Sequence, residues 1–157
     1  MVKSYVGKMI KIKVKKLDEK AVLPKKAHTS DFCYDVVATS CEEIARNVYK
    51  YGTGLSFEIV RNENYVFDCN LAIDFRPRSS VWKTGMVLSN CEGTVDEGYR
   101  GELFAVFYHV MTGLPIYKVG DRIGQIKLGS VMPVEFVESN ELSDTERGAG
   151  GYGSTGR

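Results

Sequence analysis

Residues able to do acid–base chemistry are concentrated between Ser89 and Phe104, in the segment SNCEGTVDEGYRGELF. Its three glycines separate short runs of β-forming residues, which predicts a strand, a turn and a second strand. Strand alternation would direct Asp96 away from Glu97, so that one carboxylate could face a cleft and act as a general base for a water molecule. The alternative is that both acids are ordinary turn residues and that Tyr99 is a core or interface aromatic.

The segment DFRPRSSVWKTG is a candidate anion site. Pro77 should end a strand, and Ser79 or Ser80 is suited to be the N-cap of a short helix whose first N–H groups favour an anion. Arg78 could add charge-assisted hydrogen bonds to the same anion. Serine caps and surface arginines are common, so a purely structural cap is an equally good interpretation.

Two further stretches contain polar residues next to expected strands. In HTSDFCYDVVA, Asp31 and Asp35 precede or begin a strand, either as turn acids or as indirect anchors for a cation. In VGDRIGQI, Gln125 is the neutral polar side chain of an otherwise apolar strand edge. A buried glutamine needs hydrogen-bond partners, which a ligand phosphate or a backbone group could supply.

The glycine-rich segment RGAGGYGSTGR, residues 147–157, contains a G-x-G-x-x-G pattern. A dinucleotide site would need a strand before these glycines and a helix after them, and a P-loop would need a lysine where Ser154 stands. The remaining property is a backbone that can approach phosphate oxygens, with Arg147, Ser154 and Thr155 as donors and Tyr152 as a face for base stacking. A disordered tail, which could order when a ligand binds, is the alternative.

Short strands must position these residues. KMIKIKVKK alternates apolar residues with lysines, the period-2 pattern of a half-buried strand. Only CEEIARNVYK and the residues after RSS could be helical. The sequence therefore predicts a mainly β fold, a barrel or sandwich. The other expected strands span residues 34–38, 55–60, 65–75, 86–88, 103–110, 123–128 and 131–137.

The chain is expected to divide into a β domain, residues 1–138, and an arm, residues 139–157. The segment that follows Phe136 is polar and has too few apolar residues to pack a core. RNENYVFDC is expected to form the tip and return strand of a hairpin.

Composition bounds the partners and the compartment. The 157 residues suit one domain, and a formal charge of +1 gives no general attraction to nucleic acid or membranes. No apolar run is long enough to span a bilayer. The four cysteines form no C-x-x-C pair and no signal segment opens the chain, so we expect reduced thiols in a soluble, cytoplasmic protein.

Taken in order, these stretches resemble the five motifs of the homotrimeric deoxyuridine triphosphatase (dUTPase) family. The matching segments are CYDVVA, PRSS, GTVDEGYRGE, GDRIGQI and RGAGGYGSTG, and the resemblance covers about residues 27–156. It implies a jelly-roll-like distorted β-barrel with one short helix and a flexible C-terminal arm. It also implies a homotrimer whose active sites lie between subunits, with the arm closing over a neighbour's site.

The implied reaction converts dUTP and water to dUMP and pyrophosphate with Mg²⁺ as cofactor. In the family this supplies dUMP for thymidylate synthesis and limits uracil incorporation into DNA. By resemblance, Asp96 is the general base that activates the attacking water, Tyr99 packs under the deoxyribose, and Asp35 holds Mg²⁺ indirectly, through water. Uracil would be recognised by Asn90 with the hairpin backbone at Gly93 and Val95, and would stack on Tyr152. The implied phosphate contacts are Arg78, Ser79, Ser80, Gln125, Arg147, Gly153, Ser154 and Thr155.

Some positions depart from the family pattern. Ser80 stands where many members have glycine, Gly98 stands where many have a second aspartate, and the stretch from residue 48 to residue 75 is longer than usual. Two other functions remain. A dCTP deaminase, which shares the fold, would need a glutamate base where this chain has Val106. A nucleotide-binding regulatory protein of the same fold would have lost turnover.

Overall fold

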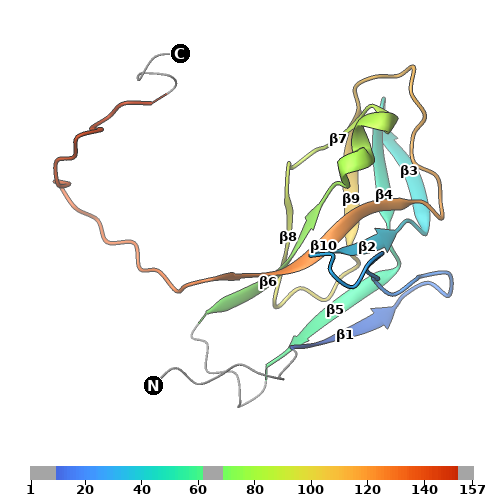
Figure 1. Ribbon diagram of the computed structural model, residues 1–157, viewed down its shortest axis with the longest axis horizontal. Coiled ribbons are helices and arrows are strands. Elements are labelled where there is room, and N and C mark those ends of the chain that lie inside the picture. The colour runs from blue at the N-terminus through green and yellow to red at the C-terminus, as the bar shows by residue number, and fades with distance from the viewer. Residues whose placement is uncertain (1–9, 62–68, 152–157) are drawn as a thin grey trace.

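The computed structural model describes residues 10–61 and 69–151, and it is mainly β, as expected. The described strands form two four-stranded antiparallel sheets, in the orders β2-β10-β6-β8 and β3-β4-β9-β7, and a separate two-stranded antiparallel sheet, β1-β5 (Figure 1). This is a distorted jelly-roll-like arrangement with one short helix. The strands are β1 (Lys11–Lys16), β2 (Tyr34–Val37), β3 (Ser40–Ala45), β4 (Val48–Gly52), β5 (Leu55–Val60), β6 (Asn70–Arg76), β7 (Met86–Leu88), β8 (Gly93–Asp96), β9 (Phe104–His109) and β10 (Arg122–Val131).

One core holds the sheets together, and its centre is aromatic. Tyr51 and Phe107 are fully buried, and their rings meet edge to face with centroids 5.9 Å apart. The Tyr117 ring also packs edge to face against both, with its centroid 6.1 Å from that of Tyr51 and 5.8 Å from that of Phe107. The Tyr51 hydroxyl donates a hydrogen bond of 3.0 Å to the Tyr117 carbonyl, and burial raises the pKa of Tyr51. Edge-to-face packing of this kind adds to the burial of apolar area, so it holds the loop residue Tyr117 against the sheet that contains β4 and β9.

CEEIARNVYK, one of the two stretches that could have been helical, is instead the hairpin of β3 and β4. Asn47, with a positive φ of 60°, lies in the connecting turn, and its N–H donates to the Glu43 carboxylate at 3.0 Å. β4 also pairs with β9 along its whole length. Pairing with a central strand therefore outweighs the helix-forming tendency of the glutamates, alanine and arginine.

The short helix after RSS is confirmed as a 3₁₀ helix, η1 (Ser79–Thr84). The expected serine cap is wrong. Arg78 occupies the N-cap position in an extended conformation and makes no side-chain capping bond. Ser79 and Ser80 are the first two helical residues instead.

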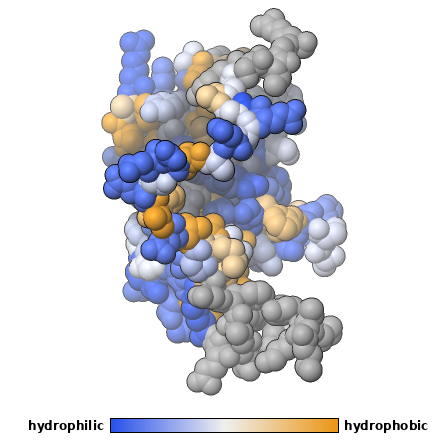
Figure 2. Space-filling view, turned by 90° about the vertical axis from the view of Figure 1, so that its left-hand side faces the viewer, coloured by the Kyte–Doolittle hydropathy of each residue, from blue (hydrophilic) through white to orange (hydrophobic). Residues whose placement is uncertain are grey.

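β10 is longer than expected, and the polar segment after it extends away from the body (Figure 1). A separate strand at residues 131–137 is wrong, since only Val131 is in a strand and it ends β10. Residues 131–149 are all exposed, including Phe136 at 95%. Figure 2 views the molecule from the side toward which this segment projects, and hydrophobic residues are visible there among hydrophilic ones.

The expected hairpin around RNENYVFDC is not formed by the strands on either side of it. Among the described residues, β5 pairs with β1, whereas β6 pairs with β10 and β8. The tip itself, residues 62–68, lies outside the described residues. The described part of the chain contains no helix long and apolar enough to cross a membrane.

Candidate active site

A pocket of about 400 Å³ lies among β6, β7, β8 and β9. It collects the base-recognition and catalytic residues that the sequence predicted, from a segment of only ten residues. The predicted residues that line it are Asn90, Gly93, Val95, Asp96 and Tyr99. Phe75, Leu88 and Leu103 add an apolar wall.

β8 positions Asp96 at the edge of this pocket. β8 pairs with β6 from Gly93, opposite Phe75, to Asp96, opposite Ala72. Asp96 is exposed, whereas its neighbours Val95 and Glu97 are half-buried. The alternation therefore separates Asp96 from Glu97, and its carboxylate can contact water.

The turn after β8 places Tyr99 against the same pocket. The Tyr99 N–H donates to the Asp96 carbonyl at 3.0 Å, and its hydroxyl donates to the Glu102 carbonyl at 3.3 Å. The ring lies so close to Gly101 that a Cβ on that residue would be 2.2 Å from the hydroxyl oxygen. A side chain at position 101 would therefore displace the Tyr99 ring from its place on the turn.

A second cluster surrounds Asp35, which is 8% exposed, in β2. Its carboxylate accepts hydrogen bonds from Arg122 Nη1 at 2.9 Å and from Gln125 Nε2 at 3.0 Å. Arg78 Nε lies 3.3 Å from the carboxylate as an ion pair. Three of the predicted residues, Asp35, Arg78 and Gln125, are thus brought together, and Ser79 and Ser80 directly follow Arg78. The buried charge is compensated by two guanidinium groups, as burial of a carboxylate demands.

A register shift in β10 makes this cluster possible. Arg122 pairs with Val37 and Gly124 with Val36, so Ile123 is an extra residue between them. Three positions apart in a regular strand, Arg122 and Gln125 would face opposite sides. The extra residue returns both side chains to the face of Asp35, as expected for a β-bulge, while Ile123 is fully buried.

The Asp35 cluster suits a cation held chiefly by phosphate oxygens. Both carboxylate oxygens of Asp35 already have cationic or amide partners. Among residues 10–61 and 69–151, no group of three His, Cys, Asp or Glu side chains could hold a metal ion. Hard cations such as Mg²⁺ commonly keep waters and substrate phosphates as ligands, so contact through water fits these residues better than direct ligation.

Asp96 and the Asp35 cluster lie apart within one subunit. On β6, Asp96 stands opposite Ala72 and Gln125 stands opposite Arg76. Four residues along a strand correspond to about 13 Å, and β8 and β10 flank β6 on opposite sides, about 10 Å apart. The predicted site residues described in one chain therefore fall into two groups, the residues around Asp96 and the residues around Asp35, and each group is a candidate half-site.

Among the described residues of the arm, 139–151, none lines the pocket or contacts the Asp35 carboxylate. Arg147 Nε donates to the Gly150 carbonyl at 2.9 Å, within the arm itself. Tyr152, Gly153, Ser154 and Thr155 lie outside the described residues.

Arg122 is one residue that the sequence analysis missed. It is in the motif GDRIGQI, three positions before Gln125, but regular alternation would have placed it on the opposite face. Glu102 was missed as well. It lines the first pocket, and its carboxylate accepts a hydrogen bond of 2.7 Å from the Gly54 N–H.

Comparison with known proteins gives consistent results. A family model described as dUTPase matches residues 19–156. The deoxyuridine 5'-triphosphate nucleotidohydrolase of Crocosphaera subtropica is 39% identical over 151 residues, covering 94% of this chain and 99% of that protein. The protein of the same name from Nautilia profundicola is 35% identical over 150 residues, covering 94% and 100%.

Solved structures share the fold. A mutant dUTPase of Staphylococcus bacteriophage 80alpha, with dUpNHpp, has a TM-score of 0.74 at 22% identity and covers 94% of this chain and 99% of that chain. A mutant dUTPase of phage phi11 of S. aureus, described with a structural Mg(II) ion, has a TM-score of 0.65 at 19% identity and covers 85% and 99%.

Proposed function

The chain belongs to the dUTPase family, and from that premise we propose that it hydrolyses dUTP to dUMP and pyrophosphate. The observation that carries the proposal is the pocket in which Asp96, Asn90 and Tyr99 meet. The resemblance assigns the role of general base to Asp96, the uracil contact to Asn90 and the deoxyribose contact to Tyr99. In the cell, the reaction would supply dUMP for thymidylate synthesis and limit uracil incorporation into DNA.

The pocket suits a pyrimidine nucleoside. The hairpin backbone at Gly93 and Val95, together with the Asn90 amide, presents donors and acceptors to a base edge. A site built to hydrogen-bond one base rejects analogues that leave its polar groups unpaired. Tyr99, fixed over Gly101, would fill the space below the sugar and oppose a 2′-hydroxyl.

Asp96 is proposed to take a proton from the water that attacks the α-phosphorus. Its exposed carboxylate needs only one ordered water within hydrogen-bonding distance to act as a general base. Phosphoryl transfer otherwise depends on positioning and charge neutralisation. Arg78, Gln125 and the N–H groups at Ser79 and Ser80 are proposed to bind the phosphate oxygens, and Mg²⁺ bound with the substrate would supply further charge neutralisation.

A complete site is proposed to need more than one subunit. The position of Asp96 supports this, because Asp96 stands opposite Ala72 on β6 whereas Gln125 of the Asp35 cluster stands opposite Arg76, four residues along the strand. A homotrimer would join the pocket of one chain to the cluster of another. The exposed segment after β10 would then carry Arg147 and the glycine-rich residues, with Tyr152 stacking on the base, to a neighbour's site.

The test is pyrophosphate release from dUTP, dCTP, dTTP and UTP, with and without Mg²⁺. We expect release from dUTP with Mg²⁺ and little from the other three. Ammonia released from dCTP would instead identify a deaminase. That alternative is disfavoured because Val106, which lines the pocket, occupies the place of the glutamate base. Binding of dUTP without any release would favour a regulatory protein.

A further inference from the structure

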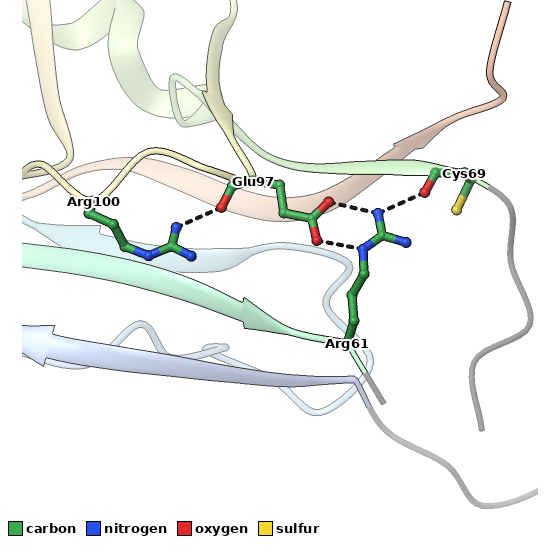
Figure 3. A network of polar contacts seen from close by, with 4 residues as sticks. All are labelled: Arg61, Cys69, Glu97 and Arg100. Carbon is green, nitrogen blue, oxygen red and sulfur yellow. Dashed lines mark hydrogen bonds and ion pairs between the residues drawn. The ribbon is translucent and has the colours of Figure 1, made fainter. Parts of the chain in front are cut away.

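An ion pair outside the predicted site residues braces the turn that carries Asp96 (Figure 3). Arg61 directly follows β5, and Glu97 directly follows Asp96, the last residue of β8. Arg61 Nε donates to Glu97 Oε1 at 2.5 Å, and Nη2 donates to Oε2 at 2.7 Å. Two parallel bonds between planar groups fix their relative orientation, which a single contact does not.

The same turn is held at further points. Arg61 Nη2 also donates to the Cys69 carbonyl at 2.8 Å, just before β6. Arg100 Nη1 donates to the Glu97 carbonyl at 2.6 Å (Figure 3). It also donates to the Tyr99 carbonyl at 3.0 Å. The Glu97 side chain is thus fixed by Arg61 and its backbone by Arg100, and Glu97 stands between two residues that line the pocket.

We propose that Arg61 is a positioning residue of the active site, which acts through Glu97 to orient the turn bearing Asp96 and Tyr99. This inference rests on the proposed function. Arg61 does not line the pocket among the described residues, so its effect would be indirect. A small displacement of a catalytic group lowers turnover far more than it lowers stability, because the reacting atoms must be aligned.

The charge of Arg61 gives it a second role beside the site. Glu97 adds a second carboxylate directly after Asp96 in the chain, near a site that would bind a highly anionic triphosphate. Hydrogen bonding to Arg61 and its positive charge lower the pKa of the Glu97 carboxyl, and the same contacts raise the pKa of Arg61. Both groups are therefore charged at neutral pH, and the arginine compensates the extra negative charge.

Exposure separates this role from simple stabilisation. The Arg61 and Glu97 side chains are 45% and 29% exposed, and ion pairs at such positions contribute little to folding free energy. The chain offers a matched control, since Lys13 and Glu58 form an ion pair of 3.0 Å between β1 and β5, with exposures of 62% and 42%. Neither residue of the control pair lines the pocket.

The experiment compares R61M, E97A, the double variant and R61K with wild type, and uses K13M as control. We expect R61M to lower kcat for dUTP about tenfold, with a melting temperature within about 2 °C of wild type. E97A and the double variant should show the same loss, because the two residues act as one unit. R61K, which keeps the charge but not the paired bonds, should recover part of the activity, and K13M should match wild type.

Other results would overturn the proposal. Wild-type kcat in R61M would show that the pair does not orient the turn. Additive losses of kcat in the double variant would show that Arg61 does not act through Glu97, and a loss of kcat in proportion to a lowered melting temperature would make the pair structural.

If wild type itself failed to hydrolyse dUTP, the proposed function would fail, and amide exchange would still test whether the Arg61–Glu97 pair holds the turn. R61M should then speed exchange at residues 97–101 and K13M should not; unchanged exchange would refute it.

Discussion

At the scale of single residues, the chain handles its two important carboxylates in opposite ways. Asp35 is buried, and its carboxylate accepts hydrogen bonds from Arg122 and Gln125 and forms an ion pair with Arg78. Its oxygens therefore hold these side chains in place. Asp96 is exposed at a strand end and lines a pocket. Only the second arrangement leaves a carboxylate available to accept a proton from water.

Replacing Asp96 by Asn should remove activity and leave the fold intact. The amide cannot accept a proton from water, and loss of a general base typically costs about 10²–10⁴-fold in rate. Because Asp96 is exposed, we expect a change in the free energy of unfolding within about 0.5 kcal/mol. Pyrophosphate release, binding of a non-hydrolysable dUTP analogue and thermal denaturation measure the three quantities. Unchanged hydrolysis would refute the assignment of the base.

Acid should weaken the contact between Glu97 and Arg61. A carboxyl whose folded pKa is lowered adds stability that is complete above its unfolded pKa, roughly 4.3, and is lost as the pH falls through the folded pKa. The difference in melting temperature between wild type and E97A should therefore be small and constant from about pH 5 to pH 7 and disappear below that range. Thermal denaturation at a series of pH values measures it. A difference that grows in acid would contradict the lowered pKa.

At the scale of elements, η1 and β10 bring the second half-site together. η1 begins directly after Arg78, and β10 pairs with both β2 and β6. The register shift at Ile123 is what allows Arg122 and Gln125 to reach the same carboxylate. No single residue type reveals this arrangement, since it depends on how two strands are aligned.

The serines of η1 offer a test at this scale. Arg78, and not a serine, is the N-cap, and no side-chain capping bond is present. S79A and S80A should therefore change the free energy of unfolding by less than about 0.5 kcal/mol. If the hydroxyls bind phosphate oxygens, each change should raise KM for dUTP by roughly tenfold, equivalent to one hydrogen bond. A large loss of stability with unchanged KM would make these serines structural.

The sequence predicted most strands because alternation and turn residues are local signals. β5 and β7 lie where they were expected, at Leu55–Val60 and Met86–Leu88. The prediction failed at CEEIARNVYK, whose residues favour a helix but whose pairing with β9 is decided by a segment more than fifty residues away. Arg122 was missed for a similar reason, since the register shift against β2 is set by tertiary pairing. Motif order indicated the remaining site residues, but not their division into two clusters.

At the scale of the whole molecule, two features support the proposal of contact with another chain: the separation of the half-sites and the exposed segment after β10. Residues 131–149 bury no side chain in a single subunit, although several are apolar. Such a segment contributes little to the subunit's own core. Its value would lie in contact with another chain.

Truncation after Glu146 should therefore separate activity from stability. Removing residues 147–157 should lower kcat/KM for dUTP by roughly a hundredfold, because the arm would no longer enclose the triphosphate. The melting temperature should stay within about 2 °C, because residues 147–149 are exposed and residue 150 is only half-buried. A large fall in the melting temperature together with the loss of kcat/KM would show that the arm is structural.

The division between the Asp96 pocket and the Asp35 cluster also has a genetic consequence. Suppose that each site takes its pocket from one chain and its cluster from another. A chain that is altered in one of these parts can then still supply the intact other part to a neighbour's site. Two inactive alleles, one altered at Asp96 and the other at Arg78, could then complement each other in the same cell. With random mixing of subunits, about one site in four would receive both intact parts.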